Sequence, residues 1–195
     1  MQFQIKKILI GLVIVFATGL PILVQAEVKI LLSTSEGDIY LSLDDQRAPV
    51  TVKNFVRYAQ EGFYHDTVFH RVIDGFMIQG GGMDASLKKK DTHENIINEG
   101  NNGLKNERGT VAMARMMEPD TANAQFFINL VDNSFLNPHA RSAGYAVFGK
   151  VSRGMDVVDK IAKANTRVLN GHENVPIKPI VIKAVSVINE IPASE

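Results

Sequence analysis

Apolar residues recur at every second position over 27–33 and again over 39–43, and the turn residues Glu36-Gly37-Asp38 separate the two runs. Alternation with a period of two is typical of half-buried strands, so we predict a hairpin here. Shorter runs of the same kind predict further strands over 109–114, 125–129, 145–151 and 180–188.

Two segments show helical spacing instead. Ala48-Pro49 opens the first, because proline in the first turn of a helix loses no hydrogen bond, and Gly62 ends it. Its apolar stripe consists of Val52, Phe55, Val56, Ala59 and Phe63. We predict a second helix over 155–164. Many short strands, two helices and no regular βαβ alternation predict a mainly β fold, a closed antiparallel barrel rather than a parallel sheet.

The segment 69–82 combines two short strands with the strong turn signal Asp74-Gly75. Before the turn, alternation places Phe69, Arg71 and Ile73 on one face and His70 and Val72 on the other. After the turn, Met77 and Gln79 share a face, and a run of glycines follows. One cation and one amide are therefore expected among large apolar side chains.

The segment 84–107 is polar, and we expect a long surface loop whose Lys88-Lys89-Lys90 run is a solvated tip. Residues 132–136 are expected to form a tight turn. Residues 175–179 are expected to form a connection interrupted by proline, before the closing strand.

The N-terminal segment is typical of a secretory signal peptide. Lys6 and Lys7 precede an uncharged apolar run, and Val24-Gln25-Ala26 has the small residues of a cleavage site. We expect residues 1–26 to be removed, leaving one domain over 27–195 in the periplasm. The alternative is an uncleaved membrane anchor, but the apolar run is short for a span and Pro21 interrupts it.

Charge and cysteine content narrow the range of functions. The 195 residues carry 21 Lys and Arg against 21 Asp and Glu, which gives no electrostatic footprint for nucleic acid or for an anionic membrane. The absence of Cys excludes thiol catalysis and Cys-ligated zinc. The five His residues lack the spacing of metal ligands, and Ser134 and Ser142 lack the pattern of a hydrolase, so we expect no metal.

The segment 69–81 resembles the signature of the cyclophilin family of peptidyl-prolyl cis/trans isomerases, Phe-His-Arg-x-Ile-x-Gly-Phe-x-x-Gln-Gly-Gly. Residues 109–114, 124–128 and 147–151 also resemble family blocks, in the family's order. Asp74 stands where many relatives have Pro, and either residue suits a turn. The resemblance implies a closed eight-stranded barrel with a helix over each end, spanning essentially all of 27–195.

Rotation of an X-Pro bond breaks no covalent bond and requires only the loss of amide resonance, so it needs no nucleophile, metal or cofactor. At the half-rotated state the prolyl nitrogen regains a lone pair, and a fixed donor aimed at it lowers the barrier. Arg71 suits this task, because guanidinium is always charged and has rigidly arrayed donors. The alternative is an arginine that covers an apolar surface or pairs with a carboxylate.

The resemblance implies roles for further residues. Gln79 and Gln125 would orient Arg71 and bind the substrate backbone. The residues before proline would lie along Ala114 and Arg115, and eukaryotic relatives often carry Asn where Arg115 stands. Proline-pocket and neighbouring substrate-binding positions fall on Phe76, Met77, Phe127, Phe135, Leu136 and Tyr145, the last where many relatives have His. Phe76 requires a twist or bulge beside Gly75, and Phe126 is expected in the barrel core.

The sequence therefore predicts a monomeric, periplasmic peptidyl-prolyl isomerase acting on proline-containing unfolded or flexible polypeptides, with no nucleic-acid partner and no membrane contact after cleavage. The rival hypothesis is a chaperone module that grips proline segments without depending on turnover.

Overall fold

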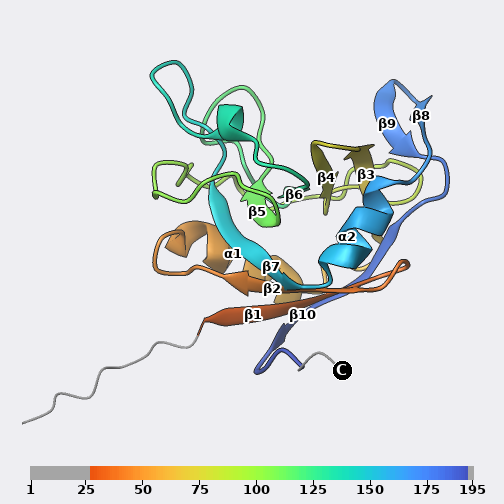
Figure 1. Cartoon of the computed structure of the whole chain (residues 1–195), viewed down its shortest axis with the longest axis horizontal. Coiled ribbons are helices and arrows are strands. Elements are labelled where there is room, and N and C mark those ends of the chain that lie inside the picture. Colours follow the sequence, from red (N-terminus) through yellow and green to blue (C-terminus); the bar gives the residue numbers. More distant parts are fainter. Residues whose placement is uncertain (1–26, 193–195) are drawn as a thin grey trace, which may run out of the picture.

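The computed structural model describes residues 27–192, in which eight antiparallel strands close into a barrel (Figure 1). In order around the barrel these are β1 (Val28–Thr34), β10 (Val181–Ile188), β3 (Thr67–Ile73), β4 (Met77–Gly80), β6 (Phe126–Asn129), β5 (Thr110–Met113), β7 (Val147–Arg153) and β2 (Asp38–Leu43). The predicted closed barrel is confirmed. The N-terminal segment expected to be a signal peptide lies outside the described residues.

Two helices, α1 (Pro49–Gln60) and α2 (Met155–Ala162), pack their apolar faces into the barrel core. Phe55 of α1 is fully buried, and its ring centroid lies 5.0 Å from Tyr64, 5.5 Å from Phe126 and 5.2 Å from Phe148. Full burial of such a side chain contributes about 1.5–3 kcal/mol. Phe126 therefore belongs to the core, as the alternation predicted. Neither of these helices is long and apolar enough to cross a membrane.

The N-terminus of α1 is capped from a distant part of the chain. Ala48 makes no side-chain cap, and the carboxylate of Glu99 takes its place. Glu99 accepts hydrogen bonds from the backbone N–H of Val50 at 3.1 Å, from that of Thr51 at 2.8 Å and from the Thr51 hydroxyl at 2.7 Å. A carboxylate is favourable here, because the first N–H groups of a helix have no partner within it. The contact fixes the long loop against the N-terminus of α1.

The segment 84–107 contains no helix or strand, as expected, but it is not simply a solvated loop. Lys88 and Lys89 are exposed. Lys90 is not free, because its ammonium donates to the backbone oxygens of Phe63 and His65. The interpretation of the lysine run as a solvated tip is therefore wrong for Lys90.

A small hairpin, formed by β8 (Thr166–Leu169) and β9 (His172–Pro176), lies outside the barrel (Figure 1). The sequence interpretation missed it and placed only a connection at 175–179. The turn is Asn170-Gly171, with φ of 50° and 78°, the conformation that tight hairpins favour. The hairpin packs through Val175 on Met83 and Leu87. Its signal was present in the sequence as Asn-Gly.

Two β-bulges change which side chains face inward. In β3 the register shifts between Phe69 and Arg71, so Phe69 joins Val72 in the core while Arg71 faces outward. The prediction that Phe69 shares a face with Arg71 is wrong, because the extra residue at a bulge reverses the alternation beyond it. A second shift beside Lys183 puts both Ile182 and Val185 in the core.

Candidate active site

Three neighbouring strands carry one row of functional side chains across the outside of the barrel. Arg71 of β3 pairs with Gln79 of β4, and Gln79 pairs with Phe127 of β6. Residues at paired positions project to the same face of a sheet. The register therefore brings together a cation, an amide and an aromatic ring that are up to 56 residues apart in the chain.

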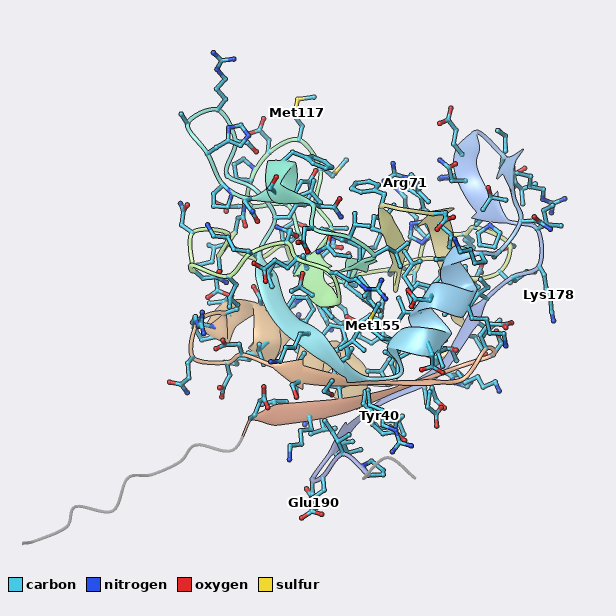
Figure 2. All side chains as sticks on the ribbon, viewed as in Figure 1. Tyr40, Arg71, Met117, Met155, Lys178 and Glu190 are labelled. Atoms are coloured by element: carbon cyan, nitrogen blue, oxygen red, sulfur yellow. The ribbon has the colours of Figure 1, made fainter. Side chains whose placement is uncertain are left out.

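This row forms one wall of a cavity of about 130 Å³. The remaining walls come from the turn before β4, the segment after β5, the short 3-10 helix η1 (Ser134–Leu136) and the residues before β7. All of the lining residues belong to the predicted site: Arg71, Phe76, Met77, Gln79, Ala114, Arg115, Phe127, Leu136 and Tyr145. Figure 2 shows the position of Arg71 beside these segments.

The apolar part of the cavity is a cluster separate from the barrel core. Met77 and Phe127 are buried in it, and Phe76, Leu136 and Tyr145 pack against them. Phe76 lies in the turn ahead of β4, where its N–H donates to Ile73 O at 3.0 Å, and Gly75 has a φ of 71°. Because Phe76 precedes the strand, it reaches the cavity without obeying the alternation of β4.

Two aromatic pairs define the rim. The ring of Tyr145 stands edge-on to Phe127 at a centroid distance of 5.7 Å. The ring of Phe135 stacks on Phe76 at 5.6 Å, is 64 % exposed and does not line the cavity. Phe135 was predicted to bind substrate. The structure places it outside the cavity, where it supports Phe76 and can contact a bound chain that extends beyond the cavity.

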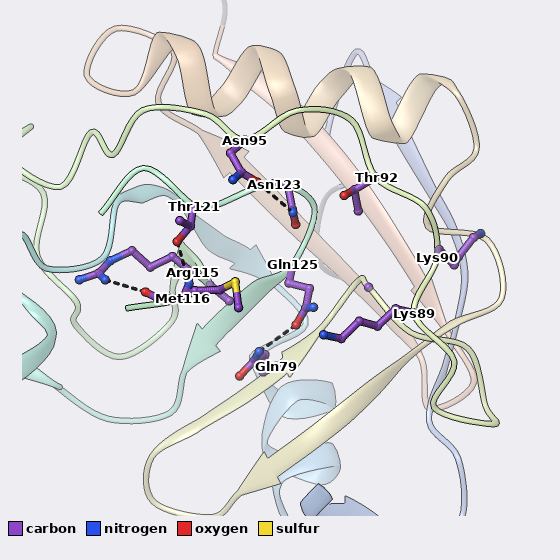
Figure 3. Close-up of a pocket in the computed structure, with 12 residues that line it drawn as sticks. Gln79, Lys89, Lys90, Thr92, Asn95, Arg115, Met116, Thr121, Asn123 and Gln125 are labelled. Atoms are coloured by element: carbon purple, nitrogen blue, oxygen red, sulfur yellow. Dashed lines mark hydrogen bonds between the residues drawn. The ribbon is translucent and has the colours of Figure 1, made fainter. Parts of the chain in front are cut away.

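Arg71 is half-buried, and its guanidinium has no hydrogen-bond or ion-pair partner within residues 27–192. Gln79 does not orient it by a hydrogen bond, contrary to expectation. The Nε2 of Gln79 donates instead to the Oε1 of Gln125 at 3.0 Å, and Figure 3 shows this pair. Gln125 lines the neighbouring cavity rather than the apolar one. The site thus presents a charged donor over an apolar cavity, beside two linked amides.

Arg115 has a different environment. Its Nε donates to Gly144 O at 2.9 Å, and its Nη1 donates to Met116 O at 2.8 Å and to Met117 O at 3.0 Å. Its guanidinium carbon also lies 4.6 Å from the centroid of the Tyr145 ring. Arg115 was expected to contact substrate residues before proline. The structure shows that most of its donors hold together the two loops that form the rim.

A buried chain of asparagines supports the cavity from behind, and the sequence interpretation missed it. Asn133 donates to Phe76 O at 3.0 Å and to Asn129 Oδ1 at 2.8 Å, and Asn129 donates to Asn106 Oδ1 at 3.2 Å. All three are at most 2 % exposed. The available signal was Asn129, a polar residue at the end of an apolar strand. The chain fixes the backbone of Phe76, which lines the cavity.

His70 lies next to Arg71 in the chain but outside the cavity, as predicted. It is 5 % exposed, and its Nδ1 has no hydrogen-bond partner. Burial lowers the pKa of His70 to about 4, with the nearby charges of His172, Arg71 and Lys89 acting in the same direction. His70 is therefore neutral near pH 7 and plays a structural part in β3.

Comparison with known proteins agrees with this geometry. Residues 29–187 match the family model described as cyclophilin type peptidyl-prolyl cis-trans isomerase/CLD. The chain is 55% identical over 161 residues to peptidyl-prolyl cis-trans isomerase A of Dickeya dadantii (strain 3937), covering 83% of this chain and 85% of that protein. It is also 55% identical over 157 residues to peptidyl-prolyl cis-trans isomerase B of Escherichia coli (strain K12), covering 79% and 96%.

A solved structure gives the same result for the fold. The crystal structure of a cyclophilin type peptidyl-prolyl cis-trans isomerase from Cryptosporidium parvum superposes with a TM-score of 0.68 at 26% identity, covering 85% of this chain and 100% of that one. The chain therefore belongs to the cyclophilin-type peptidyl-prolyl cis-trans isomerases, and cis-trans isomerisation of the X-Pro bond in proline-containing peptides is its activity.

Proposed function

We propose that Arg71 is the catalytic donor and that the clients are unfolded or flexible chains exported from the cytoplasm. The proline ring occupies the apolar cavity against Met77 and Phe127. As the X-Pro bond twists, the prolyl nitrogen becomes pyramidal and accepts a hydrogen bond from the guanidinium of Arg71. This interaction is available only to the twisted state, so it lowers the barrier without strengthening ground-state binding.

The two linked glutamines serve the substrate backbone. Gln79 and Gln125 keep unused donor and acceptor positions after bonding to each other at 3.0 Å. They can hydrogen-bond the peptide groups on either side of the proline and hold the chain while one part of it rotates. Fixing one side is required, because rotation of the whole peptide would leave the X-Pro bond unchanged.

The unpaired guanidinium is the observation that carries this proposal. Partly burying a charge without a partner is unfavourable. A module that only bound proline would gain nothing from such an unpaired guanidinium. In the rival hypothesis of a chaperone without turnover, the apolar cavity is sufficient. A coupled assay of proline-peptide isomerisation on purified protein starting at Glu27 tests the proposal. Binding without acceleration of isomerisation would favour the rival.

We further propose that the protein acts as a monomer in the periplasm after removal of residues 1–26. Support comes from Lys6-Lys7, the apolar run that follows and Val24-Gln25-Ala26. The near balance of charge supports the absence of nucleic-acid and anionic-membrane partners. Intact-mass measurement of protein from the cell envelope should give a chain that starts at Glu27. A full-length mass in the membrane fraction would contradict export with cleavage.

A further inference from the structure

A second cavity adjoins the proline cavity and has a volume of about 230 Å³. The two cavities share Gln79, Ala114 and Arg115 as lining residues, so a chain bound in one continues into the other. Most of the side chains that line the second cavity are polar, and its walls come from the segment after β4, the long loop and the segment between β5 and β6 (Figure 3).

The charges around this second cavity are all positive. Lys89, Lys90 and Arg115 line it, and no carboxylate among the described residues does. Lys90 donates to the backbone oxygens of Phe63 and His65, and Arg115 holds the rim loops. Lys89 differs from both, because its ammonium has no hydrogen bond or ion pair with any residue of the described part of the chain.

The backbone around Lys89 is fixed although its side chain is exposed. Lys89 forms an antiparallel bridge with Met83, and the N–H of Lys90 donates to Gly82 O at 3.1 Å. From this anchor the side chain of Lys89 extends toward the Gln79–Gln125 pair, as Figure 3 shows. A cation with no anion of its own thus lines the second cavity and points toward Gln79, which lines both cavities.

We propose that Lys89 selects substrates with an acidic side chain two or three residues before the proline. This proposal rests on the proposed function. The residues that precede proline are expected along Ala114 and Arg115, which line both cavities. An extended chain advances about 3.3–3.6 Å per residue, so the second or third residue enters the second cavity. A carboxylate there pairs with the Lys89 ammonium.

The test compares peptides that differ only at these positions, with Glu, Gln or Lys. An exposed ion pair is weak, so kcat/KM for the better Glu peptide should exceed that for its Gln counterpart by about two- to five-fold, with Lys below Gln. The preference should disappear at about 1 M salt, where the Debye length is about 3 Å. If Glu placed two residues after the proline were preferred instead, the proposal that the residues before proline enter the second cavity would be overturned.

Variants identify the residue responsible. Lys89→Gln should abolish the preference for Glu, and Lys89→Glu should reverse it in favour of Lys. Lys88→Gln is the matched control, because Lys88 is also exposed, carries the same charge and does not line the cavity. It should keep the preference of the unmodified protein.

The possible failures are distinguishable. If Lys89→Gln retained the preference for Glu, or if the unmodified protein showed none, the proposal for Lys89 would be overturned while isomerisation of all peptides upheld the proposed function. If no peptide were isomerised, the proposed function itself would fail.

Discussion

The two sides of the proline cavity use the same residue type for different purposes. On the side built from strands, Arg71 extends from β3 with its guanidinium unpaired within the described residues. On the side built from loops, Arg115 donates to three backbone oxygens and lies over the Tyr145 ring. A strand is held in place by backbone hydrogen bonds to its neighbouring strands. A loop forms few such bonds, so side-chain hydrogen bonds are needed to hold it.

This difference shows how the roles of two arginines in one cavity can be told apart without a bound substrate. A guanidinium whose donors are consumed by the protein's own backbone stabilises the site. A guanidinium left unpaired over an apolar cavity is available to a substrate. The comparison predicts that equal substitutions on the two sides have unequal effects on turnover.

Replacement of Arg71 should have the largest effect. A hydrogen bond from a charged donor contributes about 1.5–3 kcal/mol. Arg71→Ala should therefore lower kcat/KM by about ten- to more than a hundred-fold in the coupled peptide assay, at about 1.4 kcal/mol per decade. Arg71→Lys should restore little of the lost kcat/KM, because an ammonium lacks the planar fork of donors. Near-full turnover in Arg71→Ala would refute the assignment.

Removal of the support behind the cavity should reduce stability. Asn133→Ala leaves the buried Asn129 Oδ1 without a donor, which costs about 1–3 kcal/mol, and it removes one of the two donors to Phe76 O, which keeps the N–H of Leu130. Urea denaturation should show that loss in the free energy of unfolding. The exposed Asn101 gives a control, and Asn101→Ala should leave the free energy unchanged. Equal effects of the two substitutions would mean that the asparagine chain contributes nothing specific.

Replacement of Arg115 should have a smaller effect on turnover than replacement of Arg71. Arg115→Ala loses hydrogen bonds that hold the two rim loops together and do not reach the rotating X-Pro bond, so it loosens those loops. We expect KM to rise by about three- to ten-fold with a lesser change in kcat. Arg141→Ala removes an exposed arginine of a nearby loop and should change neither parameter. A fall in kcat as large as that of Arg71→Ala would remove the distinction between the two sides.

Change of pH should have the smallest effect on activity. The guanidinium of Arg71 does not titrate, and the pKa of His70, about 4, keeps that imidazole neutral. The rate of isomerisation should therefore be nearly flat between about pH 6 and 8. A steep bell near neutrality would implicate a histidine in the chemistry.

Below that range, His70 affects stability instead. Its folded pKa lies below its unfolded value of about 6.5, so the unfolded state binds more protons in between. The stabilisation from neutral His70 is present above about pH 6.5 and is lost as the pH falls toward 4. Denaturation midpoints of the unmodified protein and His70→Gln should converge over this interval. Parallel curves would show that His70 does not contribute.

Sequence patterns were sufficient for most of the barrel. Alternation over 27–33 and 39–43 corresponds to β1 and β2, and the apolar stripe around Phe55 corresponds to the buried face of α1. These predictions succeed because period and burial are local properties. The family signature over 69–81 gave four of the residues that line the proline cavity, and the wider family resemblance gave the other five.

The failures concern contacts between distant residues. The bulge at His70 places Phe69 on the face opposite to Arg71, and no feature of the local sequence predicts this bulge. Glu99 caps a helix 48 residues away, and only the folded chain brings the two together. The β8–β9 hairpin is different, since Asn170-Gly171 is a local signal that alternation alone did not detect, because its flanking strands are largely exposed.

The most direct test of the Arg71 assignment separates binding from isomerisation on the enzyme. NMR exchange measurements on an X-Pro peptide at saturating enzyme give the cis-trans interconversion rate in the bound state, and a titration gives the Kd. In Arg71→Ala, the bound-state rate should fall by about ten-fold or more while the Kd stays within about two-fold, because the donor acts on the twisted state. An unchanged bound-state rate with a weakened Kd would contradict the assignment, and would show that Arg71 only grips the substrate.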